Sequence, residues 1–268
     1  MFHSIYIILL IVICLSIIIP SIILQKNPYA VIKTTLVQLL KDKKKLLHFL
    51  GLFLILYFNK IEQKISEQFS VSDYTSIIQD WEGNIVYYIQ KLFLNGSLTY
   101  VLTFFYIIVF PTLMVSSIVV YLNRNDLRSF YSLVYALMLT YGIAIPFFMF
   151  FPVYEVWYFD PNVHFLIPDI YPRFEIEYRP MSGLNNNLPS LHTAISVSMA
   201  LIALHSRDRN FGKLVFICSS IIVFSTIYLG IHWLADLSAG IILAVIASQT
   251  GLRISERYEH SPQRLSLR

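Results

Sequence analysis

The sequence contains few charged residues and few cysteines. Asp, Glu, Lys and Arg make up 13% of its 268 residues, whereas a soluble domain carries roughly 25%. The two cysteines, Cys14 and Cys218, lie inside apolar runs, which argues against a disulfide framework and against a thiolate metal site. The net charge of +4 is too small to indicate a nucleic-acid partner. We therefore expect neither a soluble enzyme nor a nucleic-acid-binding protein.

Apolar residues are abundant, at 56% of the chain, and they come in long blocks. A helix needs about 20 consecutive apolar residues to span a bilayer. Spans are predicted at residues 2–24, 98–122, 130–151, 190–205, 214–230 and 233–250, with a shorter apolar segment at 46–58. The pattern predicts an all-α, polytopic membrane helix bundle with six to seven transmembrane helices.

Prolines and basic residues divide the chain further. Residues 2–24 lack a basic leader and a small-residue cleavage site, so we expect a retained anchor. Residues 25–45 predict an amphipathic helix on anionic lipid, or else a plain positive-inside anchor. A kink is expected at Pro111 and a break near Pro146. We divide the chain into an N-terminal region (1–97), a catalytic membrane bundle (98–252, with its motifs at 173–240) and a basic cytoplasmic tail (253–268).

The basic residues predict an orientation. With seven crossings and the N-terminus outside, 15 of the 20 Lys and Arg residues fall on the inner side, as the positive-inside rule requires. If residues 46–58 are re-entrant, the crossings become six and the lysine cluster at 41–45 lies outside, which the rule disfavours. Both topologies place the polar loop 152–189 and His232 on the extracytoplasmic or lumenal side.

A histidine and an aspartate four residues apart, His232 and Asp236, lie where one apolar block ends and the last begins. Residues at this spacing share one face of a helix. Ionisable groups at the mouth of a membrane helix are costly and usually functional. A carboxylate that accepts from one imidazole nitrogen leaves the other free to attack. The pair predicts a nucleophile, or else a structural contact between two spans.

A helix start is predicted near Pro189, with Asn187 or Leu188 before the helix and Pro189 in its first turn. Unpaired N–H groups at a helix start can hold an anion. Ser190 adds a hydroxyl, and His192 would lie beside that anion. A capped helix with one histidine is also common without any such site.

Two arginines, Arg173 and Arg179, lie in the polar loop together with Glu175 and Glu177. The guanidinium is a planar, permanently charged fork that suits phosphate. Ion pairs with the neighbouring glutamates are the alternative interpretation.

The order and spacing of these clusters resemble the type 2 phosphatidic acid phosphatase superfamily, which comprises membrane lipid phosphatases and lipid phosphotransferases. Its pattern is K-x6-RP, then PSGH, then SR-x5-H-x3-D. The matching residues are Arg179-Pro180, then Pro189-Ser190-Leu191-His192 with Leu191 in place of glycine, then Ser225, His232 and Asp236. The resemblance covers residues 173–240.

Two positions depart from that pattern. The lysine position holds Pro172, with Arg173 one residue later, and the position after Ser225 holds Thr226. The PSLH form, with Tyr228 before the second histidine, looks more like the inositol phosphorylceramide synthase branch, whose members move a phospho-headgroup between lipids. Fewer cations fit a phosphodiester donor, which carries less charge than a monoester.

The resemblance implies that His232 attacks phosphorus, that Asp236 orients it, and that His192 acts as general acid and base. The phosphoryl oxygens would be held by Arg179, Arg173, Ser190 and Ser225. No metal or other cofactor is implied. The expected partners are a lipid phosphate or phospholipid and the bilayer. His164 and Asp169 are near these residues in the sequence and are candidates to shape the headgroup pocket.

Other functions remain open at this point. Within the same class, the chain could hydrolyse a lipid monophosphate or a polyprenyl diphosphate. An intramembrane peptidase would use Ser190 as nucleophile, and a zinc enzyme would use His192, His232 and Asp236 as ligands. A non-catalytic lipid-binding or scaffold protein is the remaining alternative.

Overall fold

The computed structural model describes residues 2, 4–66 and 72–256, without the side chains of residues 63–66. Most of the basic tail expected at 253–268 therefore lies outside the described residues. Within them the chain forms helices and no strand, so the all-α expectation is confirmed.

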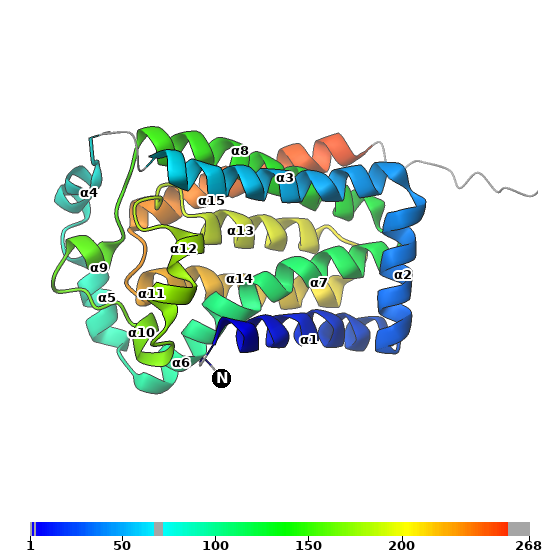
Figure 1. Ribbon diagram of the computed structural model, residues 1–268, viewed down its shortest axis with the longest axis horizontal. Coiled ribbons are helices and arrows are strands. Elements are labelled where there is room, and N and C mark those ends of the chain that lie inside the picture. Colours follow the sequence, from blue (N-terminus) through cyan, green and yellow to red (C-terminus); the bar gives the residue numbers. More distant parts are fainter. Residues whose placement is uncertain (1, 3, 67–71, 257–268) are drawn as a thin grey trace, which may run out of the picture.

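Long helices run side by side along one axis (Figure 1). In chain order they are α1 (Ile5–Leu24), α3 (Lys43–Ser66), α6 (Gly96–Phe104) continued by the π-helix η1 (Phe105–Val109) and α7 (Phe110–Asn123), α8 (Leu127–Phe150), α13 (Leu191–Leu204), α14 (Arg209–Tyr228) and α15 (Leu234–Ser255). Helix α2 (Pro28–Lys41) crosses one end of the bundle. It is the helix expected within residues 25–45, and Asn27 caps its start by accepting the N–H of Ala30.

Five helices among the described residues are long and apolar enough to cross a membrane: Ile5–Leu24, Gly96–Asn123, Leu127–Phe150, Arg209–Tyr228 and Leu234–Ser255. The chain is therefore an integral membrane protein. Helix α13 is apolar but has only 14 residues. The predicted short segment 46–58 is the middle of the 24-residue helix α3, which runs the length of the bundle in Figure 1. Helix α3 is not among the five candidate spans of the described residues, so the choice between six and seven crossings stays a prediction.

The two proline expectations have different outcomes. Pro111 is the second residue of α7, and the π-helical segment η1 ends two positions before it. The helix therefore changes its period beside this proline, while the kink itself stays a prediction. Pro146 lies inside α8, which continues to Phe150, so the expected break is wrong. Proline is tolerated in membrane helices because neighbouring groups satisfy the backbone carbonyl that it frees.

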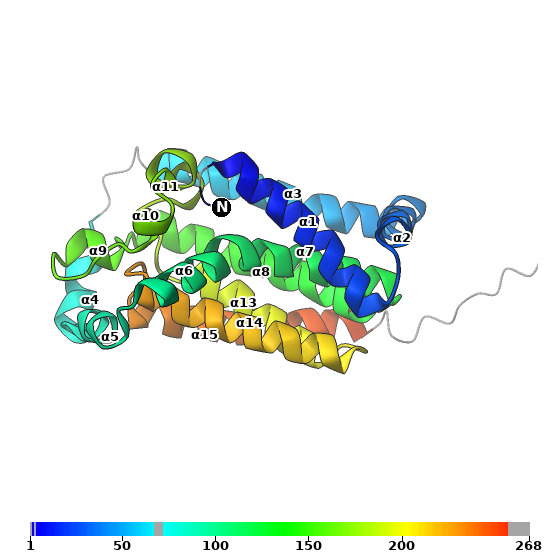
Figure 2. The same ribbon diagram turned by 90° about the horizontal axis from the view of Figure 1, so that it is seen from below.

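The centre of the bundle is α13, which packs against α8, α14 and α15. Gly240 of α15 allows a close approach to the start of α13, because a Cβ there would lie 2.8 Å from the carbonyl oxygen of Ser190 and 3.0 Å from Thr193. The start of α13 is thereby held against the first turns of α15. Figure 2 shows α1 and α3 on the opposite side of the bundle from α14.

Short helices cover the end of the bundle away from α2 (Figure 1). They are α4 (Thr75–Glu82), α5 (Ile85–Phe93), α9 (Val156–Phe159), α10 (Ile167–Ile170), α11 (Phe174–Glu177) and α12 (Arg179–Ser182). The last four lie in the segment expected to be a polar loop. Glu177 of α11 accepts the N–H of Ile5 at 2.7 Å, which attaches the start of α1 to this cover.

Candidate active site

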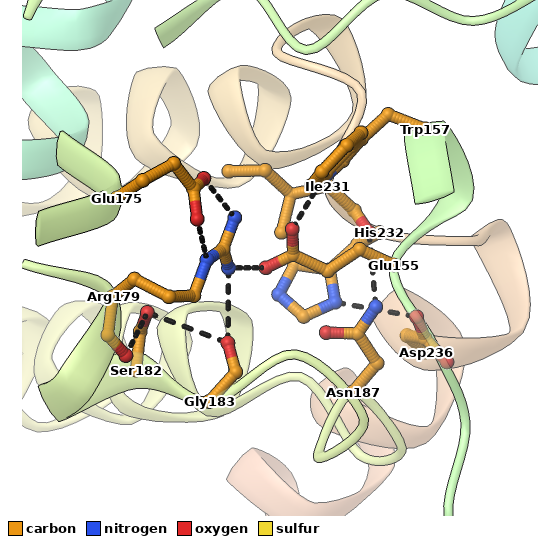
Figure 3. Close-up of polar contacts among 10 residues, drawn as sticks. All are labelled: Glu155, Trp157, Glu175, Arg179, Ser182, Gly183, Asn187, Ile231, His232 and Asp236. Carbon is orange, nitrogen blue, oxygen red and sulfur yellow. Dashed lines mark hydrogen bonds and ion pairs between the residues drawn. The ribbon is translucent and has the colours of Figure 1, made fainter. Parts of the chain in front are cut away.

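His232 lies in the short segment between α14 and α15, and Asp236 lies in the first turn of α15. His232 Nδ1 donates to Asp236 Oδ2 at 3.2 Å (Figure 3), and the same oxygen accepts the N–H of Trp233 at 3.0 Å. The contact therefore comes from a capped helix start, and not from a shared helix face as the spacing predicted. Since a carboxylate accepts, the proton is on Nδ1. No described residue bonds Nε2.

The start of α15 is also held from α4. The carboxylate of Glu82 accepts the N–H of Leu234 at 2.7 Å and the N–H of Ala235. A carboxylate is favourable at a helix N-terminus, where N–H groups are unpaired. Burial raises the pKa of Glu82, and the two N–H groups partly oppose that shift. Glu82 was absent from the predicted site, because nothing in the sequence connects α4 with residue 234.

His192 is the second residue of α13. Its ring stacks on Tyr106, with centroids 4.1 Å apart, and lies 4.4 Å from the ring of Phe110. Its Nε2 is buried and has no hydrogen-bond partner among the described residues. An unpaired buried nitrogen is costly in a resting protein, and it is available to a ligand.

The start of α13 differs from the prediction by two to three residues. Ser190 is the N-cap and accepts the N–H of Thr193, so Pro189 precedes the helix. The serine hydroxyl can reach back to the helix backbone, which neither Asn187 nor Leu188 does here. No acceptor among the described residues is found for the N–H groups of the first two helical residues, so these amides remain available to an anion.

Both histidines line one cavity of about 290 Å³. Its polar wall includes Glu155, Asn187 and Tyr178. Burial raises the pKa of Tyr178 to about 12, so this phenol remains a neutral donor. The apolar wall comes mainly from α1, η1 and α7, through Ile5, Ile8, Leu9, Val12, Ile107, Phe110 and Pro111. The cavity thus combines a small polar end with a long apolar side formed by membrane helices.

Arg179 borders this site from α12. Its Nε and Nη2 donate to the two oxygens of Glu175, at 3.1 and 3.0 Å, and its Nη1 donates to Glu155 at 2.5 Å and to the carbonyl oxygen of Gly183 at 2.9 Å (Figure 3). The guanidinium also lies over aromatic rings, namely Trp157, Phe165 and Phe174. Burial raises the pKa of Glu155, and Arg179 opposes that shift.

The other predicted phosphate-binding residues lie elsewhere. Arg173 pairs with Glu177 at 2.9 Å, and its side chain is 58% exposed. The buried Ser225 donates to the carbonyl oxygen of Ile222 at 2.6 Å. Thr226, at the departing motif position, bonds its own helix in the same way. The structure therefore brings His192, His232 and Asp236 together. The four predicted phosphate-binding residues do not line the cavity: Arg173, Arg179, Ser190 and Ser225.

Two further residues considered from the sequence also lie away from the cavity. His164 contacts Gln90 through its backbone N–H and carbonyl oxygen, and neither His164 nor Asp169 contributes to the lining. No group of three or more His, Cys, Asp or Glu side chains placed to hold a metal ion occurs in the described part of the chain, so the three residues of the zinc alternative do not form a ligand cluster.

Asn187 and Glu155 are site residues that the sequence did not identify as such. The Asn187 amide donates to the carbonyl oxygen of Ile231 at 3.0 Å, next to His232. Glu155 follows the end of α8, and its backbone N–H bonds Leu184. A carboxylate in a loop belongs to no helical or strand repeat in the sequence. The position of Glu155 beside the cavity therefore follows only from the three-dimensional structure.

Comparison with known sequences gives one result for this chain. The sequence model of the PAP2 superfamily matches residues 79–250, a range that begins within α4 and includes Glu82 and both histidines. No curated protein and no solved structure matches the chain.

Proposed function

Since this chain belongs to the PAP2 superfamily, we propose that it is a membrane enzyme that transfers the phosphoryl group of a lipid through a phosphohistidine on His232. The observation that carries the proposal is the meeting of His192 with the His232–Asp236 pair on one cavity that has an apolar side. A nucleophile, an orienting carboxylate and a second proton carrier are the groups that such a transfer needs.

In the first step, His232 Nε2 attacks phosphorus and the bond from phosphorus to the lipid oxygen breaks. His192 gives its proton to the departing oxygen, so the lipid leaves as an alcohol. Asp236 stabilises the positive charge that develops on the His232 ring, because it already accepts from Nδ1. Positioned proton transfer of this kind contributes roughly 10²–10⁴ in rate.

In the second step, an acceptor hydroxyl gives its proton to His192 and attacks phosphorus, and the bond to His232 breaks. The acceptor is water in a hydrolase and an alcohol in a phosphotransferase. The ring of His192 is fixed by its stack on Tyr106, so the same nitrogen would serve both steps.

Charge on the phosphoryl oxygens would be stabilised by two sources. One is the start of α13, where the Ser190 cap leaves the first N–H groups available. The other is the positive charge of Arg179, which does not line the cavity but bonds the cavity residue Glu155. Preorganised charge of this kind is usually the largest single contribution to catalysis.

The substrate class follows from the shape of the cavity. The polar end accommodates a phosphate or phospho-headgroup, and the apolar wall from α1 and α7 accommodates a hydrocarbon chain. We propose transfer between lipids, as in inositol phosphorylceramide synthases, because the site lacks the lysine and the second arginine that bind a highly charged monoester. Hydrolysis of a lipid phosphate is the second candidate, favoured by the superfamily match.

The orientation of the site is also a proposal. The cavity is lined in part by residues of the loop 152–189, among them Glu155, Tyr178 and Ser182. The short helices of this loop gather at one end of the bundle, and α2 lies at the other (Figure 1). Arg124 pairs with Asp208 near the α2 end, at 3.0 Å. The positive-inside rule then places the cavity on the extracytoplasmic or lumenal side.

Purified protein with phosphorus-labelled phospholipid tests this function. The sample is divided, and one half receives an alcohol acceptor such as inositol or a ceramide. Label on the acceptor supports transfer, and free phosphate or free headgroup phosphate supports hydrolysis. Full turnover by His232→Ala would refute both, since each needs this nucleophile.

A further inference from the structure

A carboxylate lies in the part of the cavity where the proposed function needs a phosphate. The side chain of Glu155 is 5% exposed and lines the same cavity as His192 and His232. Figure 3 shows it between the guanidinium of Arg179 and the ring of His232. An anion at this point is unexpected in a site that binds anions.

Four of the five N–H donors of the Arg179 guanidinium have partners among the described residues. Glu175 takes Nε and Nη2, while Glu155 and the carbonyl oxygen of Gly183 take Nη1. The two carboxylates differ in place: the side chain of Glu175 is 47% exposed and does not line the cavity. Phosphoryl oxygens that approach Arg179 from the cavity therefore meet Glu155 first.

Glu155 is also held in place from its other side. The indole N–H of Trp157 donates to its second carboxylate oxygen, and its backbone N–H bonds the carbonyl oxygen of Leu184 at 3.1 Å. With both oxygens bonded, the carboxylate is fixed next to the cavity. It is held there as the ion-pair partner of the Arg179 guanidinium.

The charge of the substrate then decides how well it binds. A phosphomonoester carries a charge of about −1.5 to −2 at neutral pH, and a phosphodiester carries one negative charge. Repulsion from a fixed carboxylate in a poorly solvated cavity is roughly proportional to that charge. One arginine, shared between two glutamates, leaves little positive charge to offset it.

We propose that Glu155 is a specificity-determining residue that favours phosphodiester lipids over phosphomonoester lipids. This inference rests on the proposed function, and it names the donor class of the same site. Glu155 acts by adding one negative charge beside the phosphoryl position and by occupying the cavity side of Arg179.

A matched pair of lipids and a matched pair of variants test this inference. Dioleoyl phosphatidic acid is the monoester, and dioleoyl phosphatidylmethanol is a diester that differs by one methyl group. In both, attack by His232 breaks the bond to diacylglycerol, so release of diacylglycerol measures both reactions. Glu155→Gln removes the cavity charge, and Glu175→Gln removes a charge from the same arginine on its exposed side.

The measured quantity is the ratio of kcat/KM for the monoester to that for the diester. We expect Glu155→Gln to raise this ratio about tenfold or more, because one unit charge close to phosphorus is removed from a weakly screened site. Glu175→Gln should change it by less than about threefold, since exposed charges are screened by solvent. An unchanged ratio in Glu155→Gln, or an equal change in both variants, would overturn the inference.

Two further measurements distinguish a failure of this inference from a failure of the proposed function and from a folding defect. If the wild-type protein releases diacylglycerol from neither lipid, the proposed function is wrong. The inference is then tested by equilibrium binding, as the ratio of the affinity for the monoester to the affinity for the diester. Glu155→Gln should raise this ratio as well. If Glu155→Gln does not fold, Trp157→Phe removes the N–H that fixes the carboxylate. A smaller shift toward the monoester is then expected, and no shift would overturn the inference.

Discussion

Replacing Glu82 with glutamine should slow turnover while leaving substrate binding nearly unchanged. Glu82 accepts two N–H groups at the start of α15, directly after His232 and Trp233. Glutamine has the same length but one acceptor oxygen and no charge. At least one charge-assisted hydrogen bond is lost, which is worth about 1.5–3 kcal/mol.

Part of the lost free energy lowers the stability of the protein, and part displaces His232. If about half of it reaches the transition state, kcat falls roughly threefold to tenfold, since 1.36 kcal/mol corresponds to one factor of ten. KM should change by less than about twofold, because Glu82 does not line the cavity. The assay is steady-state release of diacylglycerol, with the melting temperature recorded in the same detergent.

Asp80→Asn is the control, because Asp80 lies on the same helix and is exposed. It should leave kcat and the melting temperature unchanged. A Glu82→Gln protein that melts earlier but keeps the wild-type kcat would refute the reasoning, since Glu82 would then stabilise α15 without positioning His232.

Two other predictions concern carboxylates. Asp236→Asn should lower kcat about tenfold to a hundredfold, because the hydrogen bond that supports the charged ring of His232 is worth about 1.5–3 kcal/mol; steady-state kinetics with an unchanged kcat would contradict this. The hydrogen bond from Tyr171 lowers the pKa of Glu177, with the N–H of Ile5 and Arg173 contributing. The attachment of α1 to α11 should therefore be present above the ordinary carboxyl pKa and be lost as the pH falls through the lowered one. The rate of amide hydrogen exchange at the start of α1, corrected for the intrinsic exchange rate, should rise in the wild-type protein as the pH falls to that value. In Glu177→Gln it should be raised already at neutral pH.

The helical architecture could be predicted from the sequence because hydrophobic blocks report directly on membrane helices. Boundaries were less accurate where short polar side chains decide them. Ser190 caps α13, and Asp208 caps α14 by accepting the N–H of Phe211, so both helices begin where a cap is available. Pro146 shows the reverse case, in which the surrounding bundle overrides a local preference for a break.

The catalytic residues of the candidate site could be predicted from the sequence, but the residues that surround them could not. The spacing of His232 and Asp236 predicted their contact, although a capped helix start produces it. The pairing of Arg179 with Glu175 agrees with the alternative interpretation of the sequence. Its bond to Glu155 could not be predicted, because Glu155 reaches it across 24 positions of sequence. The contribution of α1 to the cavity was likewise missed, since an apolar anchor carries no sign of which side faces a site.

Trapping of the covalent intermediate tests directly whether His232 is the nucleophile. His192→Ala removes the residue proposed to protonate the departing oxygen and to activate the acceptor, while leaving His232 and Asp236 in place. The phosphohistidine should therefore form slowly and then persist. After incubation with lipid labelled in its phosphate, the account predicts stoichiometric, acid-labile label on the peptide that contains His232, and no label in His232→Ala. Absence of label in His192→Ala despite lipid cleavage, or label on another residue, would contradict the account.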